Sequence, residues 1–177
     1  MSLLARFSSL LADTSPKAVA TAKYIEAILD GKVVIPGGIT MLMAELACDG
    51  YVNPEIDDGR FPGADPFVSS EGVVPVEIDM DVWDDPKAIA YLADMKPPMQ
   101  PVNPDKGIKW AAENPDAQRK SPLVILGQKC CVSDGGVCVL VLRGFVGERH
   151  AYLRDVQHRF DRCYRVLAEL KELAPGT

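Results

Sequence analysis

The sequence predicts an α+β protein. It is expected to have an antiparallel sheet with a central C-terminal β-hairpin, packed by a long C-terminal helix and by short N-terminal helices. Three observations support this class. Two apolar runs flank an Asp-Gly pair in the last third of the chain, and a helical repeat of apolar residues follows them. Shorter helix signals, broken by proline and glycine, precede them.

The two apolar runs are residues 123–126 and 137–142, and every residue in them is apolar. A strand with one face in water would alternate apolar and polar residues, whereas a continuous apolar run is typical of a strand buried on both faces. We therefore expect both strands in the centre of the sheet.

The connection between these strands contains Ser-Asp-Gly-Gly at residues 133–136. Asp-Gly accommodates the positive φ angles of a tight two-residue hairpin turn, so the strands should be adjacent and antiparallel. Counting outward from such a turn predicts Val132 opposite Val137 and Cys131 opposite Cys138.

Residues 148–173 are predicted to form one long amphipathic helix, with Pro175 and Gly176 marking its end. Apolar residues recur there at spacings of three and four, as on one face of a helix. These residues are Leu153, Val156, Phe160, Cys163, Leu167 and Leu170.

The opposite side of this helix should carry a basic stripe. Arg165 has Asp161 and Glu169 four residues away on either side, which fits a solvated face with paired charges. Arg154 and Arg162 have no acid three or four residues away, which favours contact with an acidic surface, for example on another copy of the chain. The stripe consists of Arg154, His158, Arg162 and Arg165.

The whole chain, 1–177, is predicted to be a single domain. Residues 1–12 are predicted to form an amphipathic N-terminal arm, because their apolar residues recur with the spacing of one helix face. Helices are then expected over 16–29 and 41–48, with a short strand at 33–35 between them.

Two long ordered loops are expected, at 51–72 and 96–122, because turn-forming residues are dense in the first and prolines in the second. Between them lies a half-exposed strand over 74–82 and a helix that starts near Asp85. One or two turns of helix are also expected over residues 108–113, within the second loop.

The polar face of the 74–82 strand carries Glu77, Asp79 and Asp81. Such a row could gather a divalent cation, but residues on one strand face lie about 6.5–7 Å apart, too far for two to share an ion unaided. The alternative is a solvated edge whose charges discourage strand pairing or meet a basic partner surface. The sequence favours the alternative, and no metal site is predicted.

Cysteine and histidine residues gather in the C-terminal third, but they lack the Cys-x-x-Cys spacing of a zinc site. A cysteine nucleophile would need a histidine within reach, which the predicted helix does not provide. Buried free thiols are the favoured interpretation. The residues concerned are Cys130, Cys131, Cys138, His150, His158 and Cys163.

The bulk composition is that of a soluble protein, with 47 % hydrophobic and 25 % charged residues and a net charge of −6. The charge disfavours nucleic acid and anionic membranes as partners. Five cysteines, an odd number, favour a reducing compartment, and no apolar run is long enough for a membrane span. We expect a cytoplasmic or virion-associated protein that is neither secreted nor transmembrane.

The hairpin with its flanks, residues 123–146, followed by the predicted helix 148–173, resembles the layout of phage neck and tail-completion (tail terminator-like) proteins. These are small α+β subunits that form rings at the head–tail junction. The resemblance is architectural and covers about a third of the chain. It implies a virion component with no catalysis and no cofactor.

The sequence favours a non-enzymatic assembly protein that contacts copies of itself or other protein subunits, with no catalytic residues. The alternative is a small enzyme or ligand-binding protein with a pocket between the 51–72 loop, the 97–122 segment and the C-terminal hairpin. The residues that would line such a pocket are Tyr51, Arg60, Trp83, Trp110 and His150.

Overall fold

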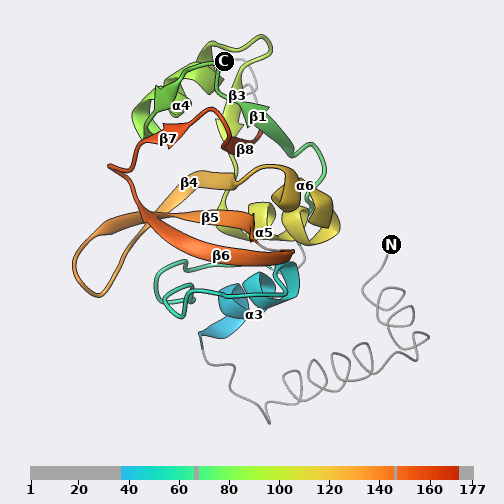
Figure 1. Cartoon of the computed structure of the whole chain (residues 1–177), viewed down its shortest axis with the longest axis vertical. Coiled ribbons are helices and arrows are strands. Elements are labelled where there is room, and N and C mark those ends of the chain that lie inside the picture. The colour runs from blue at the N-terminus through green and yellow to red at the C-terminus, as the bar shows by residue number, and fades with distance from the viewer. Residues whose placement is uncertain (1–36, 66–67, 146, 172–177) are drawn as a thin grey trace, which may run out of the picture. The chain divides into compact units, whose positions relative to one another are not determined.

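The chain folds around a six-stranded sheet in the order β1-β8-β4-β5-β6, with β3 also paired to β8 (Figure 1). The computed structural model describes residues 37–65, 68–145 and 147–171. The predictions for the arm 1–12, the helix 16–29 and the strand 33–35 lie outside these residues.

The helices are α3 (Gly38–Ala47), α4 (Asp85–Asp94), α5 (Pro104–Glu113) and α6 (Pro115–Lys120). The strands are β1 (Val74–Glu77), β2 (Val82–Trp83), β3 (Met99–Pro101), β4 (Leu123–Cys131), β5 (Val137–Phe145), β6 (Glu148–Asp155), β7 (Phe160–Asp161) and β8 (Arg165–Leu170).

The α+β class is confirmed, and so is the central position of the hairpin. Strands β4 and β5 pair antiparallel in the interior of the sheet, and β6 continues antiparallel on the far side of β5. The pairing of β4 with β8 is parallel, and β2 and β7 form a separate two-stranded sheet.

Both faces of the central strands are buried, as their continuous apolar runs predict. Leu123, Ile125, Leu140 and Leu142 on one face pack with apolar residues of α3 and α5. Val124, Leu126, Val139 and Val141 on the other face pack with residues of α4, β2 and β7. Figure 1 shows α3 and α4 on opposite sides of the sheet.

The predicted register of the hairpin is wrong by one residue, because the turn is longer than a two-residue turn. Cys131 pairs with Val137, and Cys130 pairs with Cys138. The Gly135 N–H donates to the Val132 carbonyl at 2.9 Å, and Gly135 has a φ of 87°. A type I turn followed by a left-handed glycine makes a three-residue loop with a bulge, which shifts the pairing.

The long helix over 148–173 is also wrong, because this segment forms β6, β7 and β8 up to Leu170. Two aspartate side chains turn the chain between these strands. The Gln157 N–H donates to Asp155 Oδ1 at 2.6 Å, and the Cys163 N–H donates to Asp161 Oδ1 at 2.8 Å. Asx turns of this kind compete with helical hydrogen bonding.

The apolar residues that were predicted to line one face of that helix do not form a single packed face. Cys163 and Leu170 are exposed, whereas Val166, Leu167 and Ala168 are consecutive in the chain and all fully buried. Three adjacent buried residues indicate a strand covered on both faces, which is the position of β8 between β1 and β4.

Other elements follow the sequence more closely. Helix α3 matches the helix expected over 41–48, and α4 starts at Asp85 as expected. The 74–82 strand divides into β1 and β2. The segment 96–122, expected to be mainly extended, contains β3, α5 and α6.

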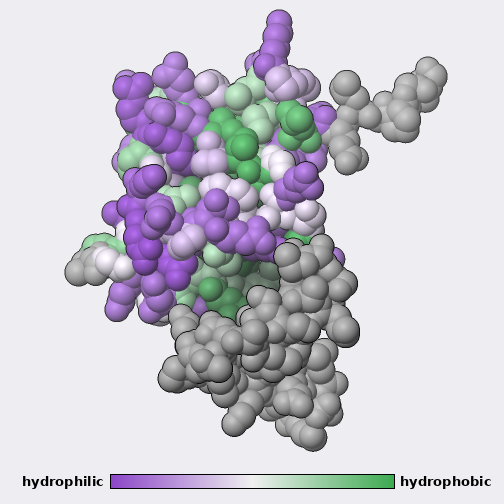
Figure 2. All heavy atoms as spheres, turned by 90° about the vertical axis from the view of Figure 1, so that its right-hand side faces the viewer, coloured by the Kyte–Doolittle hydropathy of each residue, from purple (hydrophilic) through white to green (hydrophobic). Residues whose placement is uncertain are grey.

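Figure 2 shows a mainly hydrophilic surface on the face turned towards the viewer, with a hydrophobic area at the height of β1 and β8. The side chains of Val74 in β1 and Leu170 in β8 are 42 % and 57 % exposed. Exposed apolar side chains of this kind are common in folded proteins.

The loop that follows α3 is anchored by Asp58, which caps the N-terminus of that helix. The Ile39 N–H donates to Asp58 Oδ2 at 2.9 Å, and the Thr40 N–H and hydroxyl each donate to Oδ1 at 2.7 Å. A Cβ at Gly38 would lie 2.1 Å from Asp58 Oδ2, so the carboxylate fits only because residue 38 is glycine. Gly37, at the N-cap position, has no side chain that could do the same.

This anchor also sets the charge state of Asp58. Burial alone would raise the pKa of the carboxyl, but the hydrogen bonds from Thr40 and Ile39 outweigh burial. The pKa of Asp58 therefore lies below its usual value.

We expect Asp58→Ala to lower the free energy of unfolding by about 1 kcal/mol near neutral pH, the usual cost of a lost helix cap. Because the pKa is lower in the folded chain than in the unfolded chain, this stabilisation is present above about pH 4 and is lost as the pH falls through the folded-state pKa. Urea unfolding of both proteins at about pH 7 and about pH 3 measures it. Asp94→Ala, at an exposed carboxylate of α4, is the control. An equal difference between wild type and Asp58→Ala at both pH values would contradict the assignment.

Candidate interaction surface

The predicted acidic and basic residues meet within one chain. The Arg162 guanidinium lies 3.4 Å from Asp79 and 3.6 Å from Asp81. The antiparallel pairing of β1 and β8 places Glu77 opposite Arg165, and their charged groups lie 2.9 Å apart. A contact between copies through these residues would have to compete with these ion pairs. Ion pairs this exposed contribute little to stability individually.

The other two residues of the predicted stripe lie elsewhere. The His158 ring meets the buried Phe160 ring edge-on at 5.0 Å, in the turn after β6. Arg154 lies on β6, with its guanidinium carbon 5.9 Å from the centre of the Tyr152 ring. The structure therefore divides the stripe between two places.

Arg154 borders a cluster of rings that we call the aromatic patch: Tyr51, Phe145, His150 and Tyr152. The centres of the Tyr51 and Tyr152 rings are 5.6 Å apart, and His150 stacks on Tyr152 at 5.7 Å with an angle of 4°. Phe145 meets His150 edge-on at 6.2 Å. Tyr51 and Phe145 are 48 % and 57 % exposed, so the patch opens to solvent.

The period of a β-strand places these residues together. His150, Tyr152 and Arg154 occupy alternate positions of β6 and so lie on one face of the sheet. Arg143, on β5, pairs with His150 and lies on the same face. Strand β6 is the last strand on this side of the sheet.

The start of the 51–72 loop holds Tyr51 against the outer edge of β6. The Ala151 N–H donates to the Tyr51 carbonyl at 2.8 Å, and the Asn53 N–H donates to the Ala151 carbonyl at 3.0 Å. The Gly50 N–H donates to the Arg149 carbonyl at 2.9 Å. These bonds satisfy part of an edge that would otherwise be open to other strands.

The His150 side chain also fixes the segment that contains Tyr51. Its Nδ1 accepts a hydrogen bond from the Tyr51 N–H at 3.1 Å, which requires an unprotonated Nδ1. A Cβ at Gly50 would lie 2.8 Å from His150 Nε2, so only glycine allows the backbone to approach the ring this closely. His150 therefore has a positioning role towards Tyr51.

Two arginines and one carboxylate lie beside the patch, and the carboxylate is Glu148 of β6, 3.6 Å from His150 Nε2. Arg143 and Arg154 are exposed, and neither forms an ion pair with another residue that the structure describes. The chain as a whole carries a net charge of −6. The patch is thus an aromatic surface beside two arginines on an acidic protein.

The alternative pocket between the 51–72 loop, the 97–122 segment and the hairpin corresponds to a cavity of about 60 Å³. It has room for a few water molecules, whereas sites for organic ligands usually measure about 300–1,000 Å³. The residues that line it are Phe61, Pro62, Gly63, Ala64, Asn103, Pro104, Asp105 and Gln128.

None of the five residues that the sequence suggested for this pocket lines that cavity. Tyr51 and His150 belong to the aromatic patch. Arg60 pairs with Asp57 at 2.6 Å and Glu55 at 2.8 Å. Trp83 is fully buried and stacks on Phe160 at 4.7 Å. Trp110, in α5, is partly buried against the core cluster that includes residues of α3.

The cysteines are all unpaired thiols. Burial raises the pKa of Cys48 to about 12 and that of Cys130 to about 11. Burial also raises the pKa of Cys138 and of Cys163. These four thiols therefore stay protonated near neutral pH, where a nucleophile would need to be a thiolate.

The described part of the chain has neither a cluster of metal ligands nor a membrane-spanning helix. Within it, no three histidine, cysteine, aspartate or glutamate side chains come together in a way that could hold a metal ion. No helix in that part is long and apolar enough to cross a membrane.

Comparison with known proteins gives no match, whether the chain is compared with family models, with curated protein sequences or with solved structures. The geometry of the molecule therefore carries the functional argument. The sequence had not singled out Phe145 and Tyr152. The alternation of His150, Tyr152 and Arg154 was a strand signal that could have identified the surface.

One buried charge lies outside the patch. Asp85, in the first turn of α4, is 1 % exposed, and its carboxylate contacts the Lys129 ammonium of β4. Apart from this ion pair, its oxygens have no hydrogen-bond partner among the described residues. Lys129 is therefore the main compensation for this buried charge.

We expect Lys129→Met to lower the free energy of unfolding by about 2 kcal/mol, because it leaves the Asp85 carboxylate buried without its counter-charge. The loss should be smaller than for a fully buried pair, since the Lys129 side chain is 45 % exposed. Lys87→Met is the control, because its ammonium lies 3.7 Å from the more exposed Asp84, and it should cost less than about 0.5 kcal/mol. Urea unfolding measures both. The double variant Asp85→Asn/Lys129→Met should recover part of the loss, and no recovery would contradict the explanation.

Proposed function

We propose that this chain is a non-enzymatic assembly protein, and that its copies contact one another through the aromatic patch and the two arginines beside it. The observation that carries the proposal is the exposed, mutually packed set of rings at the edge of the sheet. Tyrosine, phenylalanine and arginine are enriched at protein interfaces, and tyrosine and arginine dominate their binding energy.

The rings are already ordered in the free chain. The Tyr51 ring packs against Tyr152, and the Tyr152 ring packs against His150. Backbone hydrogen bonds fix Tyr51 to β6. A partner that covers this surface would therefore lose little side-chain entropy on binding. Preorganisation of this kind is typical of a surface that binds.

The charge favours a head-to-tail arrangement. If two copies met patch to patch, Arg143 and Arg154 of one copy would face the same arginines of the other, which is unfavourable. The acidic remainder of a neighbouring copy complements them. Such heterologous contacts close into a ring when the rotation between copies allows it.

A role in a phage neck or tail-completion ring stays a prediction from the layout of the sequence. Of the two elements behind it, the hairpin is present as β4 and β5, and β6 to β8 occupy the place of the helix. The proposed ring of subunits is consistent with such a role, and so would be an assembly with other protein subunits.

The test is the absolute mass in solution by light scattering, over a range of concentrations at low and high salt. We expect the wild type to form an oligomer that is strengthened at low salt, because the contact includes opposite charges. Phe145→Ser/Arg154→Glu should weaken assembly by at least about tenfold, the effect of losing about 1.4 kcal/mol at the interface.

Ile89→Ser is the matched control, because Ile89 is 40 % exposed on α4, away from the patch. It should assemble like the wild type. A wild type that is monomeric at every concentration and salt would overturn the proposed contact between copies. So would a patch variant that assembles as well as the control.

A further inference from the structure

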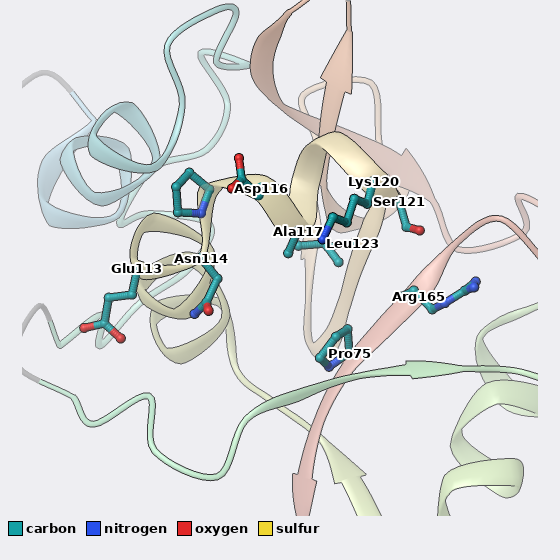
Figure 3. A pocket seen from close by; sticks show the side chains of 10 residues that line it. Pro75, Glu113, Asn114, Asp116, Ala117, Lys120, Ser121, Leu123 and Arg165 are labelled. Atoms are coloured by element: carbon teal, nitrogen blue, oxygen red, sulfur yellow. The ribbon is translucent and has the colours of Figure 1, made fainter.

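A hollow in the surface lies apart from the aromatic patch. It measures about 520 Å³, within the range of sites for small organic molecules. Figure 3 shows it between the end of α5, α6 and the strands β1, β4 and β8. The residues that line it are Pro75, Glu113, Asn114, Pro115, Asp116, Ala117, Lys120, Ser121, Leu123 and Arg165.

The hollow exists because the chain breaks between two short helices. Helix α5 ends at Glu113, and Pro115 starts α6 after a single residue, Asn114, with a φ of −125° and a ψ of 60°. Pro75, Ala117 and Leu123 provide an apolar lining from β1, α6 and β4.

The acidic groups around this lining are already engaged. Glu113 accepts a hydrogen bond from the Ser70 hydroxyl, and Asp116 lies 3.2 Å from the Arg119 guanidinium. The Asn114 amide nitrogen donates to the Trp110 carbonyl at 2.9 Å, which leaves its oxygen as an acceptor. The Arg119 guanidinium offsets the charge of Asp116, whereas the Ser70 hydroxyl leaves the charge of Glu113 in place.

Of the two positive groups, Lys120 is the less engaged. Lys120 is exposed and has no ion pair with another described residue, and its side chain extends over Ala117 and Leu123 (Figure 3). The Ser121 hydroxyl, next to Lys120, is an additional donor. Arg165 adds a fixed positive charge, held by Glu77 at 2.9 Å and by the Arg162 carbonyl at 2.6 Å.

We propose that this hollow binds a small organic carboxylate with an apolar body. The carboxylate pairs with the Lys120 ammonium and accepts a hydrogen bond from Ser121, while the apolar body packs on Pro75, Ala117 and Leu123. Charge-assisted hydrogen bonds of this kind are the stronger ones, and the apolar contact gains further affinity from the surface removed from water. The site goes beyond the proposed assembly role and shares no residue with the aromatic patch.

The test uses 4-phenylbutyrate as the probe, with 4-phenylbutanol and 4-phenylbutylamine as analogues of the same shape. Titration of the ¹⁵N-labelled full chain should shift the amides of residues 113–123. We expect the acid to bind at least about tenfold more tightly than the alcohol, the equivalent of about 1.4 kcal/mol. The amine should bind more weakly than the alcohol, because Lys120 and Arg165 repel it.

Lys120→Met keeps the apolar stem and removes the charge, so it should reduce the preference for the acid over the alcohol to about twofold or less. Lys96→Met, at an exposed lysine outside the hollow, should leave the preference unchanged. Ala117→Leu, which fills the hollow without changing charge, should weaken all three probes.

No binding of the acid up to about 10 mM would overturn this proposal, and so would equal affinity for acid and alcohol or an unchanged preference in Lys120→Met. The patch variant Phe145→Ser/Arg154→Glu should bind 4-phenylbutyrate like the wild type. Failure of the ligand site and failure of the proposed assembly contact are therefore separate results.

Discussion

Two sets of contacts hold the loop that carries Tyr51, and the first joins the Asp58 carboxylate to the N-terminus of α3. The backbone of Ile39 and Thr40 and the Thr40 hydroxyl donate to this one carboxylate, and Gly38 leaves the space for it. The cap fixes the 51–72 loop at its middle, and the hydrogen bonds to β6 fix it at its start. Held at both points, the loop presents Tyr51 beside Tyr152. Both sets of contacts offset part of the conformational entropy that the loop loses when it becomes ordered.

The sequence predicted those parts of the fold in which burial alone determines structure. Two continuous apolar runs identified β4 and β5 and their central position, because only strands covered on both faces are apolar throughout. The register was missed, since one extra residue in the turn changes every pair and depends on the conformation of Gly135. The C-terminal segment was misassigned because its apolar spacing fits a helix, while the Asx turns at Asp155 and Asp161 and the burial of β8 favour strands. Local patterns cannot show which tertiary surface a segment will meet.

The misassignment of residues 148–173 as a helix also explains why the sequence did not identify the aromatic patch. As a helix, residues 148–173 displayed a basic stripe that needed an acidic partner, and the sequence suggested that Glu77, Asp79 and Asp81 of another copy could provide it. As strands, the segment places Arg162 and Arg165 beside these acids in the same chain. The surface that remains is aromatic, with Arg143 and Arg154 beside it. Its members come from β5, β6 and the loop before them, so no single sequence window contains them all.

The most direct test of the central claim is hydrogen exchange of the full chain at a low and at a high protein concentration. If copies contact one another through the aromatic patch, amides of the 49–53 segment and of β6 become more protected as the concentration rises. Amides on the exposed side of α4 should remain unchanged. Protection that does not depend on concentration at β6, or that appears only on surfaces away from the patch, would contradict the account.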